Sequence, residues 1–66
     1  EALASYGRAV AEYDAALRLA PDYILARNNK GNALASQGDV EARQARHEEA
    51  LASYGRAVAE YDAALR

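Results

Sequence analysis

The most polar stretch of the chain is residues 27–32, RNNKGN, in which three asparagines stand beside an arginine and a lysine. An Asn amide offers donors and acceptors, and an Arg guanidinium offers a fork of donors that matches a carboxylate. Such groups can hydrogen-bond the backbone or the terminal carboxylate of an extended peptide. The stretch is therefore the candidate binding site of this sequence.

Catalytic and metal chemistry find little support. His47 is the sole histidine, cysteine is absent, and no acidic residue stands four places from that histidine. A metal site needs three or four converging ligands, and a nucleophilic serine needs a base and an orienting partner. Gly31 and Gly38 are not followed by Lys-Ser or Lys-Thr, so they form no phosphate-binding loop. We expect a protein that is not an enzyme and has no catalytic residues, metal or cofactor.

Charge and hydropathy narrow the range of partners. The net charge of -2 comes from interspersed cations and anions, without the one-signed field that attracts nucleic acid or an anionic membrane. No apolar run approaches the roughly 20 residues of a membrane span, and the N-terminus lacks a signal-peptide layout. We expect a soluble protein that binds proteins, peptides or other copies of itself, not nucleic acid or membrane; the sequence does not fix its compartment, and the cytoplasm is favoured.

One segment occurs twice without a substitution: EALASYGRAVAEYDAALR fills residues 1–18 and returns at residues 49–66. The second copy begins 48 residues after the first, so 66 residues hold about 1.4 repeat units. Repeat arrays supply surfaces that bind partners, and fewer than three units are rarely stable alone. A natural array and an engineered or consensus array would both show this pattern.

The elements that position these residues are helices, because the chain is rich in alanine and poor in glycine and proline. Apolar side chains spaced three and four apart indicate a helix over residues 1–20, which Pro21 ends. We predict two further helices, at 23–37 and 40–66, separated by a turn at Gly38-Asp39. The predicted fold class is all-α, with antiparallel helical hairpins of an α-solenoid in a single repeat segment over 1–66.

The last predicted helix contains two similar heptads, EALASYG and RAVAEYD. We predict that each tyrosine ring of this seam covers a facing alanine, since large and small side chains interdigitate in dense cores. The same period could build a coiled coil. Gly7 and Gly55 cost about 1 kcal/mol each in a helix. Either they allow two helices to approach closely, or they lie at exposed positions where the loss is tolerated, and we favour exposed positions.

The spacing of small residues resembles a known family. GNALASQG at 31–38 places two glycines seven apart, and Ala9, Tyr13, Ala16 and Pro21 stand four, three and five residues apart. This combination resembles the tetratricopeptide repeat (TPR), a helix pair with glycine in its first helix and an alanine, aromatic, alanine, proline series in its second. The resemblance implies a TPR-like scaffold whose first helices line a groove for a peptide or a helix.

The resemblance also implies site residues. Asn29 and Asn32 would face the groove with Arg27 beside them, although asparagines at these positions also make hydrogen bonds between repeats. Arg27 and Lys30 stand where the family has an aromatic residue and a leucine. The unit of 48 residues exceeds the usual length of about 34 by two heptads, which we assign to a lengthened second helix.

Two functions stay open: a protein–protein interaction scaffold, and a structural module that assembles with copies of itself. The segment that follows the middle helix is identical to the one that precedes it, so a contact within one chain can be repeated between chains. We therefore expect homo-oligomers. The predicted helix-packing residues are Tyr6, Ala9, Tyr13, Ala16, Gly31, Leu34, Tyr54, Ala57, Tyr61 and Ala64.

Overall fold

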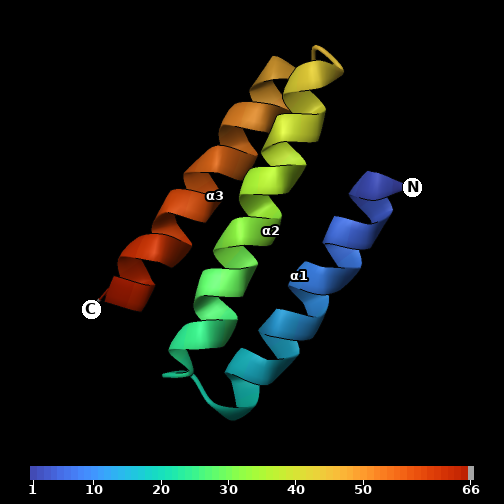
Figure 1. The fold of residues 1–66 in the computed structure, drawn as a ribbon. Helices are drawn as coiled ribbons and strands as arrows, with labels where there is room; N and C mark the ends of the chain where they lie inside the picture. Colours follow the sequence, from blue (N-terminus) through green and yellow to red (C-terminus); the bar gives the residue numbers. More distant parts are fainter. Residues whose placement is uncertain (66) are drawn as a thin grey trace.

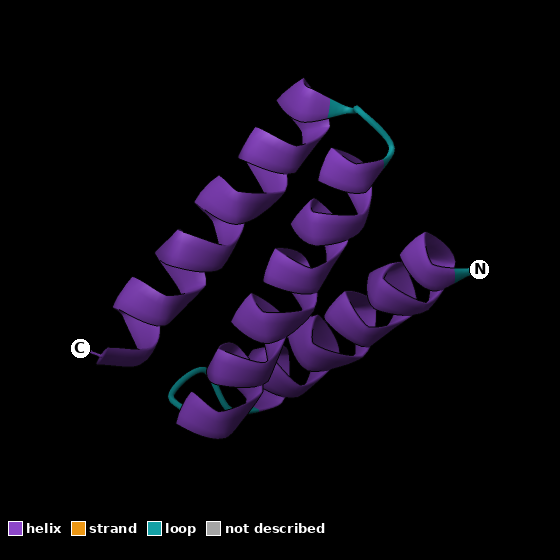
Figure 2. Cartoon of the chain, turned by 45° about the horizontal axis from the view of Figure 1, so that its top comes forward, coloured by secondary structure: helices purple, strands orange, loops and turns teal. Residues whose placement is uncertain are grey.

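The computed structural model describes residues 1–65, which form three helices joined by short turns (Figure 1). The helices are α1, Ala2–Leu19, α2, Ile24–Arg43, and α3, His47–Leu65. Residues 1–65 contain no strand, so the predicted all-α class is confirmed. Successive helices run in opposite directions and α2 lies between the other two (Figures 1 and 2). With extents of 35 × 23 × 13 Å, the helices form a single flat layer.

The first turn follows from Pro21. The residue before a proline is driven out of helical geometry, and Ala20 has φ −139° and ψ 83°. The Ala20 N–H still donates to the carbonyl oxygen of Ala16 at 2.9 Å, which closes the last turn of α1. α1 therefore ends at Leu19, one residue before the predicted end at residue 20.

The predicted break at Gly38-Asp39 is wrong. α2 continues through both residues to Arg43, and α3 begins at His47 instead of residue 40. The predicted end of the last helix, at residue 66, lies outside the described residues. Gly38 remains helical because the ring of Tyr54 packs directly on it, and this contact offsets a helix cost of about 1 kcal/mol. α2 has 20 residues. The extra length of the repeat is thus divided between the two helices and does not lie in the second one alone.

The second turn lies at residues 44–46 and needs no glycine. The Ala45 N–H donates to the Ala42 carbonyl at 3.0 Å, and the Arg46 N–H donates to the Glu41 carbonyl at 2.9 Å. This pair of hydrogen bonds is the Schellman motif, whose left-handed position is usually occupied by glycine. Here Ala45 occupies it with φ 59°. The sequence hides this turn because its central residue is an ordinary helix former.

The core is thin and centred on α2. Leu34 is fully buried, and it shares a cluster with Val10 of α1 and with Ala33 and Ala57. Most of the other buried apolar side chains are alanines, which leave little side-chain volume between helices and allow their backbones to approach closely. The arrangement makes α2 the helix on which both neighbours depend.

Candidate interaction surfaces

Two glycine–tyrosine contacts join α2 to α3. The ring of Tyr61 lies on Gly31 and the ring of Tyr54 lies on Gly38, so close that a Cβ added to either glycine would be 2.7 Å from a ring carbon. Glycines and tyrosines are both seven residues apart, and antiparallel helices bring both pairs together. The tyrosine rings thus lie on glycines, where the missing side chain leaves room for the ring. Tyr61 also packs against the core cluster that contains Ala33 and Ala57.

The tyrosine hydroxyls add a hydrogen bond to each contact. The Tyr61 hydroxyl donates to Asn32 Oδ1, and the Tyr54 hydroxyl donates to Asp39 Oδ1, both at 2.5 Å. Each acceptor immediately follows its glycine, so a Gly-Asx pair receives each tyrosine. The hydrogen bond to Asp39, followed by partial burial, raises the pKa of Tyr54. The matching seven-residue spacing of Gly-Asx and Tyr was the sequence signal for these contacts.

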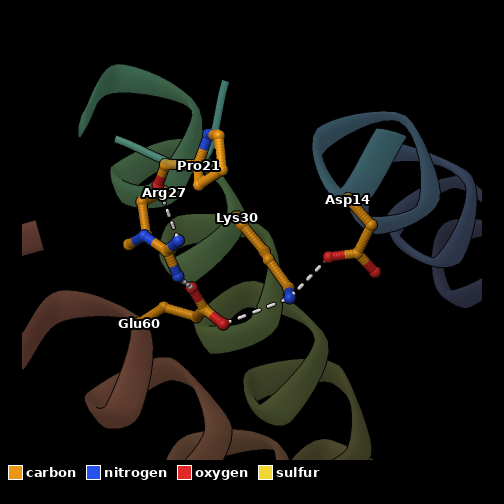
Figure 3. A network of polar contacts seen from close by, with 5 residues as sticks. All are labelled: Asp14, Pro21, Arg27, Lys30 and Glu60. Atoms are coloured by element: carbon orange, nitrogen blue, oxygen red, sulfur yellow. Dashed lines mark hydrogen bonds and ion pairs between the residues drawn. The ribbon is translucent and has the colours of Figure 1, made fainter. Parts of the chain in front are cut away.

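A charged network ties all three helices together at the Pro21 end of the layer (Figure 3). Lys30 of α2 lies between Asp14 of α1, at 2.5 Å, and Glu60 of α3, at 3.1 Å. Arg27 donates from Nη1 to Glu60 Oε2 at 3.2 Å and from Nη2 to the Pro21 carbonyl at 2.9 Å. The two cations that depart from the TPR pattern therefore hold neighbouring helices.

Lys30 stays charged because both of its partners are anions. Burial by itself lowers the pKa of this ammonium, whose side chain is 14% exposed. Hydrogen bonds to Asp14 and Glu60, with the attraction of both carboxylates, outweigh burial and raise the pKa of Lys30. The Lys30 side chain is therefore an ammonium ion throughout the neutral range.

The predicted peptide-binding residues have mixed surroundings. Arg27 is half-buried and engaged as described, and exposed Asn32 accepts the Tyr61 hydroxyl. Asn29 is half-buried, and its side chain has no hydrogen bond within residues 1–65. A surface pocket of about 480 Å³ lies beside Arg27, lined also by Pro21, Ala59, Asp62 and Ala63. Two of the three residues thus act within the chain, and a pocket adjoins one of them.

A buried polar group closes the other end of the α2–α3 pair. Ser53 is 3% exposed and donates to Glu41 Oε1 at 2.6 Å. Gln37 donates from Nε2 to Ser53 Oγ at 3.2 Å. Sequence reasoning missed this group, because a serine and a glutamate twelve residues apart give no local pattern.

The two copies of the repeated segment, α1 and α3, turn different faces of their own toward α2. In α1, Val10 is 8% and Leu17 is 9% exposed, whereas their counterparts in α3, Val58 and Leu65, are 57% and 86% exposed. Leu51, one heptad before Val58, is exposed as well. We call Leu51, Val58 and Leu65 the outer face of α3.

The predicted helix-packing residues all lie at least partly within the layer. Buried ones occur on α2 and α3, and the others are half-buried. The buried set is Gly31, Leu34, Ala57 and Ala64, and the half-buried set is Tyr6, Ala9, Tyr13, Ala16, Tyr54 and Tyr61. Gly7 and Gly55 are exposed, with no atom within 4 Å of an added Cβ.

Within residues 1–65, metal-ligand clusters and membrane-crossing helices are both absent. His47, the first residue of α3, is exposed, and residues 1–65 contain no group of three His, Cys, Asp or Glu side chains able to hold a metal ion. None of the three helices is both long and apolar enough for a membrane crossing. No family model, curated protein or solved structure matches the chain significantly.

Proposed function

We propose that this chain is part of a helical repeat that acts as a non-enzymatic protein–protein interaction scaffold, and that its interaction surface is the outer face of α3. One observation carries the proposal: side chains that α1 buries against α2 are exposed at the equivalent positions of α3. The partner that fits this face is therefore a helix of the α2 type, supplied by a further repeat unit or by another copy of the chain.

The outer face has the size and spacing of a helix-docking stripe. Its three apolar residues are seven apart and span about 21 Å at 1.5 Å per residue. Burying a Val or Leu side chain stabilises by about 1.5–3 kcal/mol, and most of that burial is still available here. An exposed apolar stripe of this kind indicates a surface that packs against another helix.

Charge supports the same partner. Asp14 pairs with Lys30 where α1 meets α2, and its counterpart on α3 is Asp62, which is exposed. An α2-type helix that docked on the outer face would bring its own lysine to Asp62. The ion pair adds little energy at a surface, but it favours one register of docking over others.

The TPR resemblance supports this proposal, although the helices of this chain differ in length from those of the usual TPR unit. We propose a TPR-like α-solenoid unit in which both helices are longer than usual, by about a heptad each, so that one apolar stripe faces the partner along the whole length. Gly31 and its tyrosine contact then supply the close approach that the family obtains from its first glycine.

The test lengthens the chain by one further copy of residues 19–66, which places an α2-type helix after α3. In the original chain Val10→Ala should lower the free energy of unfolding by about 1.5–3 kcal/mol and Val58→Ala by only a few tenths. In the lengthened chain Val58→Ala should cost as much as Val10→Ala, as measured by urea unfolding. A Val58→Ala cost that stays at a few tenths there would refute docking on the outer face.

A groove for an extended peptide is the second candidate, favoured by the pocket beside Arg27 and by the side chain of Asn29. In a lengthened array, Asn29→Ala should weaken binding of a peptide ligand without changing stability, as followed by titration calorimetry. Asn28→Ala, at an exposed neighbouring position, is the matched control. Equal binding by the Asn29→Ala variant and the unchanged protein would remove this candidate.

A further inference from the structure

We propose that α1 is an intramolecular plug: it occupies a face of α2 on which the α3 of a second copy can dock instead. This inference rests on the proposed function, because it uses the same outer face of α3. It adds a competition between two identical segments, one inside the molecule and one from another molecule.

α2 presents two docking faces. One receives α3 through the glycine–tyrosine contacts, and the other receives α1 through Val10 and Leu17, with Asp14 paired to Lys30. Residues 1–18 and 49–66 are identical, so every α1 side chain in the second contact has a counterpart on α3. The exposed counterparts are Val58, Asp62 and Leu65.

Docking in trans leaves the α2–α3 hairpin of the donor intact. The tyrosine side of α3 stays on its own α2, because the outer face is formed by the residues that α2 leaves uncovered. An incoming α3 can thus reproduce the contacts of Val10, Asp14 and Leu17 with its own Val58, Asp62 and Leu65 while it remains part of its own molecule. The contact joins unlike surfaces, so it propagates into chains of copies unless the geometry forces a ring.

The tether decides which segment occupies the face. Because both segments offer the same valine, aspartate and leucine to this face, the balance depends mainly on the effective concentration of α1, which is of millimolar order for a short connection such as residues 20–23. The unchanged protein should therefore be a closed monomer at micromolar concentration, and the homo-oligomers expected from the repeat should form only at far higher concentration. A substitution that weakens α1 alone should open the face and promote assembly.

The test is sedimentation equilibrium of two full-length variants with the same composition, Asp14→Lys and Asp62→Lys. Asp14→Lys opposes Lys30 with a like charge within the chain, so half-association should occur at roughly tenfold lower concentration than for the unchanged protein. Asp62→Lys should stay monomeric at that concentration. The double variant should also stay monomeric, because its α3 has lost the complementary charge.

A second pair, Val10→Ala and Val58→Ala, repeats the comparison without a charge change. Val10→Ala should associate at lower concentration than Val58→Ala, as Asp14→Lys does relative to Asp62→Lys. The plug is wrong if Asp14→Lys associates no more than the unchanged protein, or if the double variant associates as strongly as Asp14→Lys. Circular dichroism covers a loss of folding: an Asp14→Lys chain that unfolds and stays monomeric up to millimolar concentration also contradicts the plug. The lengthened chain contains its docking helix in cis, so it tests the proposed function independently of exchange.

Discussion

Replacing each of the four glycines by alanine tests the packing of α2 against α3, because two glycines lie under rings and two are open to solvent. At Gly7 and Gly55 an added Cβ meets nothing within 4 Å. The substitution there should show the helix propensity of alanine alone and raise the free energy of unfolding by about 0.5–1 kcal/mol.

At Gly31 and Gly38 the same propensity gain is opposed by a clash. The new Cβ would lie 2.7 Å from a tyrosine ring carbon, a separation that the ring must relieve by moving. Overpacking costs about 1–3 kcal/mol, and a displaced ring also endangers its hydroxyl hydrogen bond, worth about 1 kcal/mol. The net result should be destabilisation by about 1–3 kcal/mol, opposite in sign to the exposed sites.

The assay is urea unfolding followed by far-ultraviolet circular dichroism at low protein concentration, where self-association does not contribute. A double-mutant cycle isolates the contact: with Tyr54→Ala in the background, Gly38→Ala should become stabilising by up to 1 kcal/mol, because the obstructing ring is gone. The reasoning fails if Gly38→Ala stabilises the unchanged background as much as Gly55→Ala does. It also fails if the Tyr54→Ala background does not alter the effect.

Three further predictions use positions that the structure singles out. Ala45→Gly should raise the unfolding free energy by about 1 kcal/mol, because Ala45 has φ 59°, whereas Ala42→Gly within α2 should lower it by a similar amount; thermal unfolding separates the two. Ser53→Ala should destabilise by about 1–3 kcal/mol because buried Glu41 loses its donor, whereas Ser5→Ala, at the equivalent exposed position, should cost well under 1 kcal/mol in the same assay. Stability should fall as pH rises above about 10, because folding raises the pKa values of Tyr54 and Lys30. Both groups stabilise the fold fully below their pKa values in the unfolded chain, and this stabilisation is lost as the pH rises through their pKa values in the folded chain. Tyr54→Phe should flatten that decline in urea titrations from pH 8 to about 11.5, and an equal flattening by Tyr6→Phe would contradict the assignment to Tyr54.

The parts of the fold that sequence predicted depend on local rules. Pro21 ends α1 because its ring excludes helical geometry at the preceding residue, Ala20. The spacing of apolar residues correctly predicted three helices. The turn at Gly38 was mispredicted because a glycine in a helix normally indicates an end, and only the ring of Tyr54, sixteen residues later, makes it an interior residue. Ala45 carried no turn signal, since the left-handed geometry that it adopts is rare for alanine.

The candidate site lay beyond local rules for a sharper reason. Val10 and Val58 have the same nine residues before them and the same eight after them, yet one is buried and the other exposed. No propensity, periodicity or capping rule evaluated in a window can assign them different burial. The difference arises from chain order alone, because α2 comes after one copy and before the other. The stripe of Val10 and Leu17 in the first copy therefore meets α2, while the equivalent Val58 and Leu65 in the second point away from it. The repeated sequence therefore indicates which side chains can make contacts. Which copy makes them follows only from the position of that copy relative to α2.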